Sequence, residues 1–179
     1  MAELKISFTL GERDLRHFRR EIARAMGSVD RAKEDQITAA AVSLLTRVRA
    51  AGPPDYVRER LDRLERIVQM TYDAEWSLPI PVKTRILAAL TYLTDPNDLI
   101  PDSVPGLGYL DDAIMIELCV RELKHELESY EDFCSFRTGE ASGRGLDPAT
   151  VGRAEWLEER RLELQERMRR RRSSYNSSG

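Results

Sequence analysis

The 179-residue sequence lacks several features that would place it in a familiar class. No stretch approaches the roughly 18 uninterrupted apolar residues of a membrane-spanning helix. The opening Met-Ala-Glu-Leu-Lys has neither the basic nor the apolar region of a secretory signal. The sequence also contains no Walker loop, no G-x-S-x-G elbow and no C-x-x-C pair, which excludes common nucleotide, hydrolase and zinc signatures. We therefore expect a protein with no membrane span and no activity defined by such motifs.

Cysteine is scarce, with Cys119 and Cys134 as the only two. The sequence predicts both in one helix, where 15 residues separate them by about 22 Å along the axis. A disulfide needs Cα atoms within about 7 Å, so these thiols cannot bridge each other. Two reduced thiols favour a cytoplasmic protein.

Charged residues make up 33% of the chain but are unevenly distributed. Residues 95–138 contain 11 acidic and 3 basic side chains, whereas the two ends of the chain are mildly basic. Either the basic ends fold over the acidic middle, or the middle meets a cation or a basic partner.

Helical periodicity dominates the pattern of apolar residues. It predicts helices ending near Met26, Ala50, Tyr72 and Thr94, then one long helix after residue 110 and a last helix opened by Asp147 and Pro148. The predicted inward-facing residues include Leu15, Phe18, Ile22, Ala41, Leu44, Leu61, Leu64, Tyr72, Ile86, Leu90, Ile116, Leu123, Leu127, Leu157, Leu164 and Met168. Thr9 and Glu12 have the spacing of a capping box at the start of the first helix.

Residues 3–10, ELKISFTL, alternate apolar and polar side chains and predict one short β-strand. The fold class is therefore mainly α, a helical bundle with one N-terminal strand and a C-terminal helical appendage. We predict a helical domain over residues 1–137, a Gly-rich linker over 138–150, and a charged helix with a frayed tail over 151–179.

The stretch DPNDLIPDSVPGLGYLDD, residues 95–112, is the most distinctive in the chain. Pro96 ends the preceding helix, and Pro101 and Pro105 keep the connection extended. Asp111 and Asp112 fall in the first turn of the next helix, where carboxylates favour the helix dipole. Local physics leaves Asp98 and Asp102 unexplained.

This stretch resembles the YkvA-like family, a bacterial domain of unknown function. The family signature reads roughly S-P-x-D-L-I-P-D-x-x-P-x-x-G-x-x-D-D between two apolar helices. The residues in register are Pro96, Asp98, Leu99, Ile100, Pro101, Asp102, Pro105, Gly108, Asp111 and Asp112. The resemblance covers about residues 80–125 and implies a helix–loop–helix hairpin without a catalytic assignment. Asp95 replaces the usual serine, and the hairpin is more charged than in many members, which argues against a membrane role.

The loop aspartates allow two interpretations. Asp98, Asp102, Asp111 and Asp112 could converge as oxygen ligands for Mg²⁺ or Ca²⁺. The favoured alternative is structural: each carboxylate accepts from loop N–H groups, caps a helix or pairs with a basic side chain of the hairpin, Lys83 or Arg85. We therefore expect no cofactor.

Three residues after the loop invite a catalytic interpretation. Glu122 and His125 form an E-x-x-H step, half of a di-iron carboxylate motif, but a solvated surface histidine is favoured. Glu117 lies at the edge of the apolar stripe, and pairing with Lys83 or Arg85 is favoured over general-acid chemistry.

Five arginines near the C-terminus could contact phosphates: Arg167, Arg169, Arg170, Arg171 and Arg172. Only Tyr175 accompanies them as an aromatic platform, so nucleic-acid binding is not favoured. The sequence does not name a biochemical function. It favours a non-enzymatic interaction or regulatory module that presents the acidic loop to an unknown protein partner. A metal-dependent enzyme or binding protein and a nucleic-acid or ribosome-associated factor are the alternatives.

The lone strand predicts an assembly. Residues 3–10 can be disordered, can pair with an unrecognised strand, or can pair with the same segment of a second copy, which we favour. The full chain should then run as a homodimer, and a chain beginning at Gly11 as a monomer, in size-exclusion chromatography with light scattering. Two monomeric profiles would contradict pairing between copies.

Overall fold

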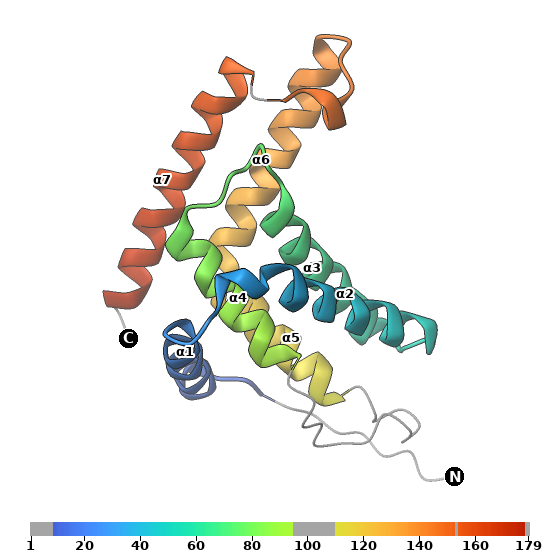
Figure 1. The fold of residues 1–179 in the computed structure, drawn as a ribbon, viewed down its shortest axis with the longest axis vertical. Coiled ribbons are helices and arrows are strands. Elements are labelled where there is room, and N and C mark those ends of the chain that lie inside the picture. The colour runs from blue at the N-terminus through green and yellow to red at the C-terminus, as the bar shows by residue number, and fades with distance from the viewer. Residues whose placement is uncertain (1–8, 95–109, 153, 178–179) are drawn as a thin grey trace.

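The computed structural model describes residues 9–94, 110–152 and 154–177, and these ranges are almost entirely helical (Figure 1). The mainly α fold is confirmed. The α-helices are α1 (Glu12–Met26), α2 (Glu34–Ala50), α3 (Asp55–Tyr72), α4 (Ile80–Leu93), α5 (Leu110–Glu122), α6 (Lys124–Gly143) and α7 (Glu155–Ser177). Short 3₁₀ helices, Arg31–Lys33 and Pro148–Thr150, precede α2 and α7. Most of the predicted strand at 3–10 lies outside the described residues, so the strand and the homodimer remain predictions.

The first helix begins later than its predicted capping box. Gly11, rather than Thr9, is the N-cap, and its backbone N–H donates to the carboxylate of Asp14 at 2.9 Å. Glu12 and Asp14 place negative charge in the first turn, where it favours the helix dipole.

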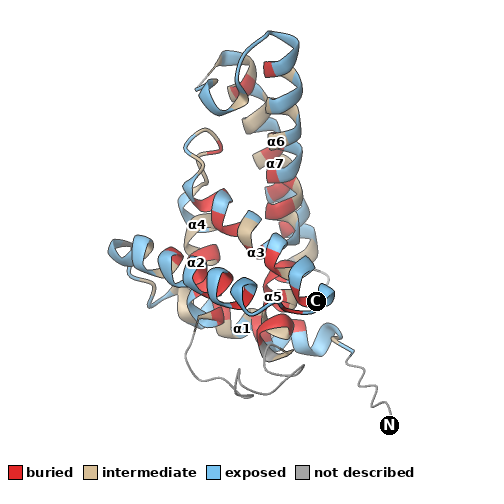
Figure 2. Cartoon of the chain, turned by 90° about the vertical axis from the view of Figure 1, so that its right-hand side faces the viewer, coloured by how far each residue is buried: buried red, intermediate tan, exposed pale blue. Residues whose placement is uncertain are grey.

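The predicted hairpin is formed by α4 and α5, and it lies at the centre of the core. Helices α1, α2 and α3 pack on α4, while α1, α3 and α6 pack on α5. Buried residues therefore gather where these helices meet, and the outer faces of α1 and α2 are exposed (Figure 2). Residues 86–90 of α4 are all fully buried.

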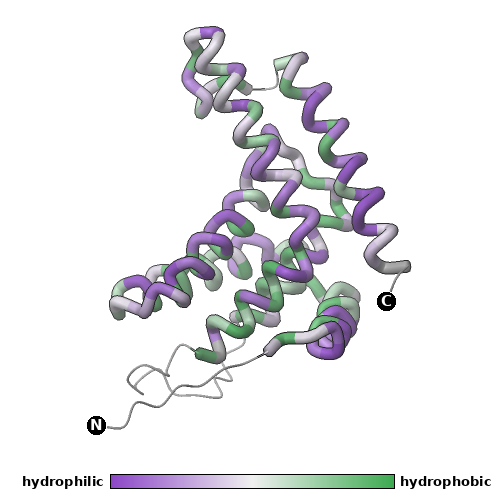
Figure 3. Tube along the Cα trace, turned by 180° about the vertical axis from the view of Figure 1, so that it is seen from behind, coloured by the Kyte–Doolittle hydropathy of each residue, from purple (hydrophilic) through white to green (hydrophobic). Residues whose placement is uncertain are grey.

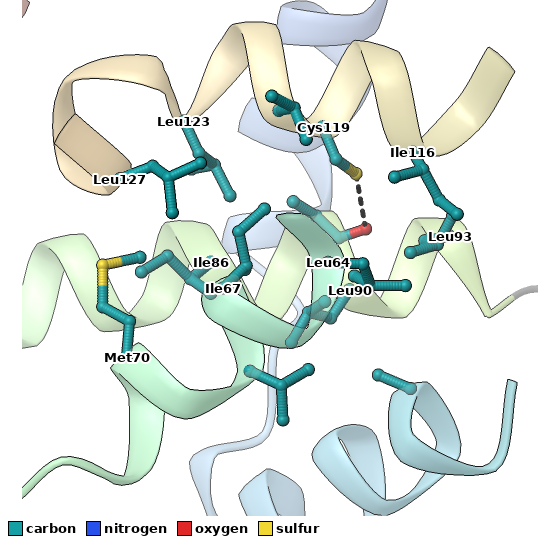
Figure 4. Packing of buried hydrophobic residues seen from close by; sticks show 14 of the residues in the cluster. Leu64, Ile67, Met70, Ile86, Leu90, Leu93, Ile116, Cys119, Leu123 and Leu127 are labelled. Atoms are coloured by element: carbon teal, nitrogen blue, oxygen red, sulfur yellow. Dashed lines mark hydrogen bonds between the residues drawn. The ribbon is translucent and has the colours of Figure 1, made fainter. Parts of the chain in front are cut away.

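Side chains from α3, α4 and α5 interlock in this core. Figure 4 shows Leu64 of α3 and Leu90 of α4 beneath the side chains of α5. The thiol of Cys119 donates a weak hydrogen bond to the backbone carbonyl of Ala89, with 3.7 Å between sulfur and oxygen. Burial raises the pKa of that thiol to about 12, so it stays protonated. Each fully buried leucine contributes about 1.5–3 kcal/mol.

The long helix predicted after residue 110 is broken at Leu123. This buried residue separates α5 from α6 and adopts φ −98°, ψ 17°. A guanidinium N–H of Arg172 donates to the backbone carbonyl of Glu122, the acceptor that an unbroken helix would offer to the N–H of Glu126. Insertion of a side chain into the backbone ladder is a known cause of helix bends. Cys119 and Cys134 therefore lie on different helices, and both are free thiols.

The predicted Gly-rich linker, residues 138–150, begins within α6. Its first residues, 138–143, complete α6, and the helix ends in a Schellman motif. In that motif Gly145 adopts φ +68°, and its backbone N–H donates to the backbone carbonyl of Ser142. The N–H of Leu146 donates to the carbonyl of Ala141 at 2.8 Å. The side chain of Asp147 caps only the short 3₁₀ helix, so α7 begins later than predicted.

The predicted frayed tail is helical as far as Ser177. Helix α7 returns alongside α6 and packs on it (Figure 1). Most of α7 is hydrophilic (Figure 3), but Leu157, Leu164 and Met168 are buried as predicted. Ion pairs between α7 and helices α6 and α5 supplement this thin apolar stripe.

Candidate functional site

The predicted acidic loop falls mainly in the stretch between Thr94 and Leu110. Asp95, Pro96, Asp98, Leu99, Ile100, Pro101, Asp102, Pro105 and Gly108 lie outside the described residues. Asp111 and Asp112 lie in the first turn of α5, as predicted, and Asp112 is buried. Among the described residues, no group of three or more histidines, cysteines and acids could hold a metal ion.

Five charged side chains meet where α1, α4, α5, α6 and α7 approach one another, and we call them the buried ion network. They are Arg19, Arg85, Glu122, Glu126 and Arg172. The carboxylates of Glu122 and Glu126 are each only 1% exposed. Because buried carboxylates are costly unless paired and hydrogen-bonded, these arginines are essential to the fold.

Glu122 is held from two sides. Its carboxylate accepts from the Nε of Arg19 on α1 at 3.2 Å and also from the guanidinium of Arg172 on α7. Arg172 donates to the backbone carbonyl of Glu122 as well. One residue thereby joins the end of α5 to the first and last helices.

Glu126, one turn further along, completes the network. It accepts from the guanidinium of Arg85 at 3.2 Å and lies 3.7 Å from that of Arg172. Burial lowers the pKa of Arg85, and the neighbouring charge of Arg172 lowers it further. The network has three positive and two negative groups, so it carries one surplus positive charge.

His125 is covered rather than solvated, which corrects the sequence-based interpretation. Its side chain is 18% exposed. Its ring packs edge to face on the ring of Tyr175, with 5.6 Å between the ring centroids. The same tyrosine ring lies 4.5 Å beneath the guanidinium carbon of Arg19. Burial lowers the pKa of His125 below its ordinary value.

Glu117 is paired, as predicted, but with other partners. Its carboxylate lies 3.3 Å from the Nε of Arg60 on α3 and accepts from Arg121 at 2.8 Å. The two predicted partners are engaged elsewhere: Lys83 pairs with Glu34 of α2, and Arg85 with Glu126.

The arginine cluster near the C-terminus is paired with acids throughout. Arg167 and Arg171 reach Asp132 and Glu128 of α6, Arg169 and Arg170 both contact Glu166, and Arg172 belongs to the buried ion network. Arginine side chains thus hold α7 against α6 and α5. The sequence indicated the charge but not the partners on α5 and α6, since those acids lie 35 to 50 residues away.

A second polar cluster, which the sequence did not indicate, follows α3. The carboxylate of Asp73 accepts from the hydroxyl of Tyr130 at 2.9 Å and from the guanidinium of Arg137 at 3.0 Å. Arg137 also donates to Glu75 at 2.7 Å. Burial alone would lower the pKa of Arg137, but the bond to Glu75 and the charge of Asp73 raise it above its ordinary value. This cluster fastens the turn after α3 to α6 and borders a hollow of about 690 Å³.

The hairpin contains the residues that match a family model. Residues 82–118, from α4 into α5, match a family model described as a protein of unknown function (DUF1232). The chain is also 46% identical over 52 residues to the uncharacterized membrane protein YkvA of Bacillus subtilis (strain 168). This hairpin is a YkvA-like segment.

The YkvA-like segment is a small part of the chain. The match to the Bacillus protein covers 28% of this chain and 49% of the relative, so the chain spans about half of the relative's length. No solved structure matches the chain. Within the described residues, no helix has the length and apolar character needed to cross a membrane.

The buried ion network predicts unequal roles for neighbouring arginines. Replacing Arg172 by methionine leaves two buried carboxylates short of a partner and should lower the free energy of unfolding by about 3–5 kcal/mol. Arg170→Met removes an exposed guanidinium paired only to Glu166 and should change it by at most about 0.5 kcal/mol. Urea unfolding of both variants measures the difference. Equal destabilisation would contradict the network's role.

His125 predicts a pH dependence of stability. Because burial lowers the pKa of folded His125 below 6.5, the unfolded chain binds this proton first as the pH falls. This contribution to stability should be fully present above about pH 6.5 and should decline below it. His125→Gln should lack that decline in urea unfolding at pH 7.5, 6.5 and 5.5. If the free energy of unfolding falls equally with pH in the two proteins, the folded histidine titrates normally, and the prediction is wrong.

Proposed function

We propose that the protein is a non-enzymatic interaction module in which the helical bundle holds the YkvA-like hairpin and presents its acidic connection to a basic protein partner. The observation that carries this proposal is that the protein's own helices bury the apolar surface of the hairpin. We therefore assign binding of a protein partner to the connection between α4 and α5.

Both helix ends beside the connection are anchored. Leu93 at the end of α4 and Ala113 in the first turn of α5 are buried in the core. The hydroxyl and the backbone N–H of Thr94 both donate to the carbonyl of Leu90, at 2.9 and 3.0 Å. Anchored ends favour binding because less conformational freedom is lost when a partner docks.

Charge supports a basic partner. Residues 95–120 contain six acidic residues and no lysine or arginine. The hairpin side chains that could have neutralised the loop aspartates, Lys83 and Arg85, are engaged by Glu34 and Glu126. A stretch of sequence rich in acids and without lysine or arginine attracts basic surfaces and speeds their encounter.

The test removes the loop charge without changing its size. Asp98→Asn with Asp102→Asn removes two carboxylates from the connection, and Glu131→Gln with Glu159→Gln removes two exposed carboxylates from α6 and α7 as a matched control. Affinity purification of the native chain, quantified by mass spectrometry, should identify basic proteins kept by the control and reduced at least about tenfold by the loop variant. Unfolding curves confirm that both variants are folded.

Two results would contradict the proposal. One is an identical set of captured proteins for the loop variant and the unaltered chain. The other is stabilisation of the unaltered chain, but not of the loop variant, by millimolar Mg²⁺ or Ca²⁺, which would favour the metal-dependent alternative.

A further inference from the structure

A hollow of about 450 Å³ lies between the start of α4, α6 and α7. Much of its wall is apolar, formed by Pro79, Pro81, Val82, Leu162 and Met168. Its size falls within the range of about 300–1,000 Å³ for small-molecule sites.

A large apolar side chain of the lining is open to water. Leu162 is 54% exposed. A hollow whose lining is largely apolar suits the hydrocarbon part of a ligand.

The buried ion network forms the polar part of the same hollow. Arg85, Glu126 and Arg172 all line it, together with the surface pair Glu166 and Arg169. These residues are three arginines and two carboxylates, and the buried ion network as a whole, Glu122 included, carries one surplus positive charge. An anionic head group would supply the missing negative charge.

Among the network residues that line the hollow, two atoms lack a hydrogen-bond partner within the described part of the chain. They are the Nε of Arg172 and the Oε2 of Glu126, from side chains only 9% and 1% exposed. The Nε–H of Arg172 can donate to a ligand oxygen, while water or a ligand hydroxyl can donate to Glu126. Buried polar groups are usually satisfied, so the Nε–H of Arg172 points to a hydrogen-bond acceptor in the hollow, while the Oε2 of Glu126 needs a donor such as water.

We propose that this hollow binds an amphipathic carboxylate, with its hydrocarbon chain along the prolines and Leu162 and its carboxylate at Arg85 and Arg172. Burial and the charge of Arg172 lower the pKa of Arg85, and an anion beside both guanidinium groups relieves that repulsion. The ligand bridges α4, within the YkvA-like segment, and α7, outside it. The inference is independent of the acidic loop.

The test uses three ligands that share a ten-carbon chain and differ in head group: decanoate, decan-1-ol and decyltrimethylammonium, each below its micellar concentration. Isothermal titration of the full chain should show decanoate binding at least about tenfold more tightly than the alcohol or the cation. Equal binding of decanoate and decanol would overturn the carboxylate site, as would failure of decanoate to bind.

Substitutions locate the site. Leu162→Gln alters an exposed wall residue and should weaken decanoate binding about fivefold. Leu146→Gln is the matched control and should leave decanoate binding unchanged. Leu146 is 50% exposed but is not part of the hollow's lining. Equal effects of the two variants would overturn the location.

A third variant and a labelling experiment address the head group. Arg85→Gln should remove the preference for decanoate over decanol, provided that circular dichroism shows a folded chain. Independently of any variant, a diazirine analogue of decanoate should label peptides containing residues 79–85 or 162–172 of the unaltered chain. Labelling confined to other peptides would overturn the proposal.

Discussion

The contact between Arg172 and Glu122 is the interaction on which the rest of the structure depends. One guanidinium binds both the carboxylate and the backbone carbonyl of the same residue, so it neutralises a buried charge and satisfies the carbonyl at the helix break. Loss of either residue would leave the other a buried charge short of one partner, so the two stabilise the fold together. The position of α7 is therefore coupled to the geometry of α5 and α6.

This coupling gives the flanking helices a defined relation to the YkvA-like segment. The segment supplies α4 and most of α5, whose apolar faces need cover. Helices α1, α2 and α3 supply most of that cover, while Arg19 of α1 and Arg172 of α7 reach the end of α5 through Glu122. The residues outside the matched segment thus bury the hairpin, and they also form one wall of the hollow beside Arg85.

Sequence periodicity predicted the helices and most of the core because apolar spacing is a local property. Phe18, Leu61, Leu90 and Leu164 were all predicted to face inward, and all are buried. Tyr72 was predicted to face inward too, but it is 51% exposed at the last turn of α3, where its hydroxyl hydrogen-bonds to Thr38. Because that hydroxyl bonds to the buried Thr38 of α2, the position of the Tyr72 side chain depends on the neighbouring helix.

The sequence by itself determined the helical class, the apolar stripes and the YkvA-like hairpin, because propensity, spacing and motif are all local along the chain. Only the tertiary structure decided the partners of the charged residues. Glu117 and Arg172 each meet side chains from distant helices, and which acid meets which arginine depends on how the helices pack. The break at Leu123 was decided in the same way. The apolar spacing through Leu123 predicts one continuous helix. The guanidinium of Arg172, fifty residues away, instead donates to the carbonyl of Glu122, which would have accepted the next helical hydrogen bond.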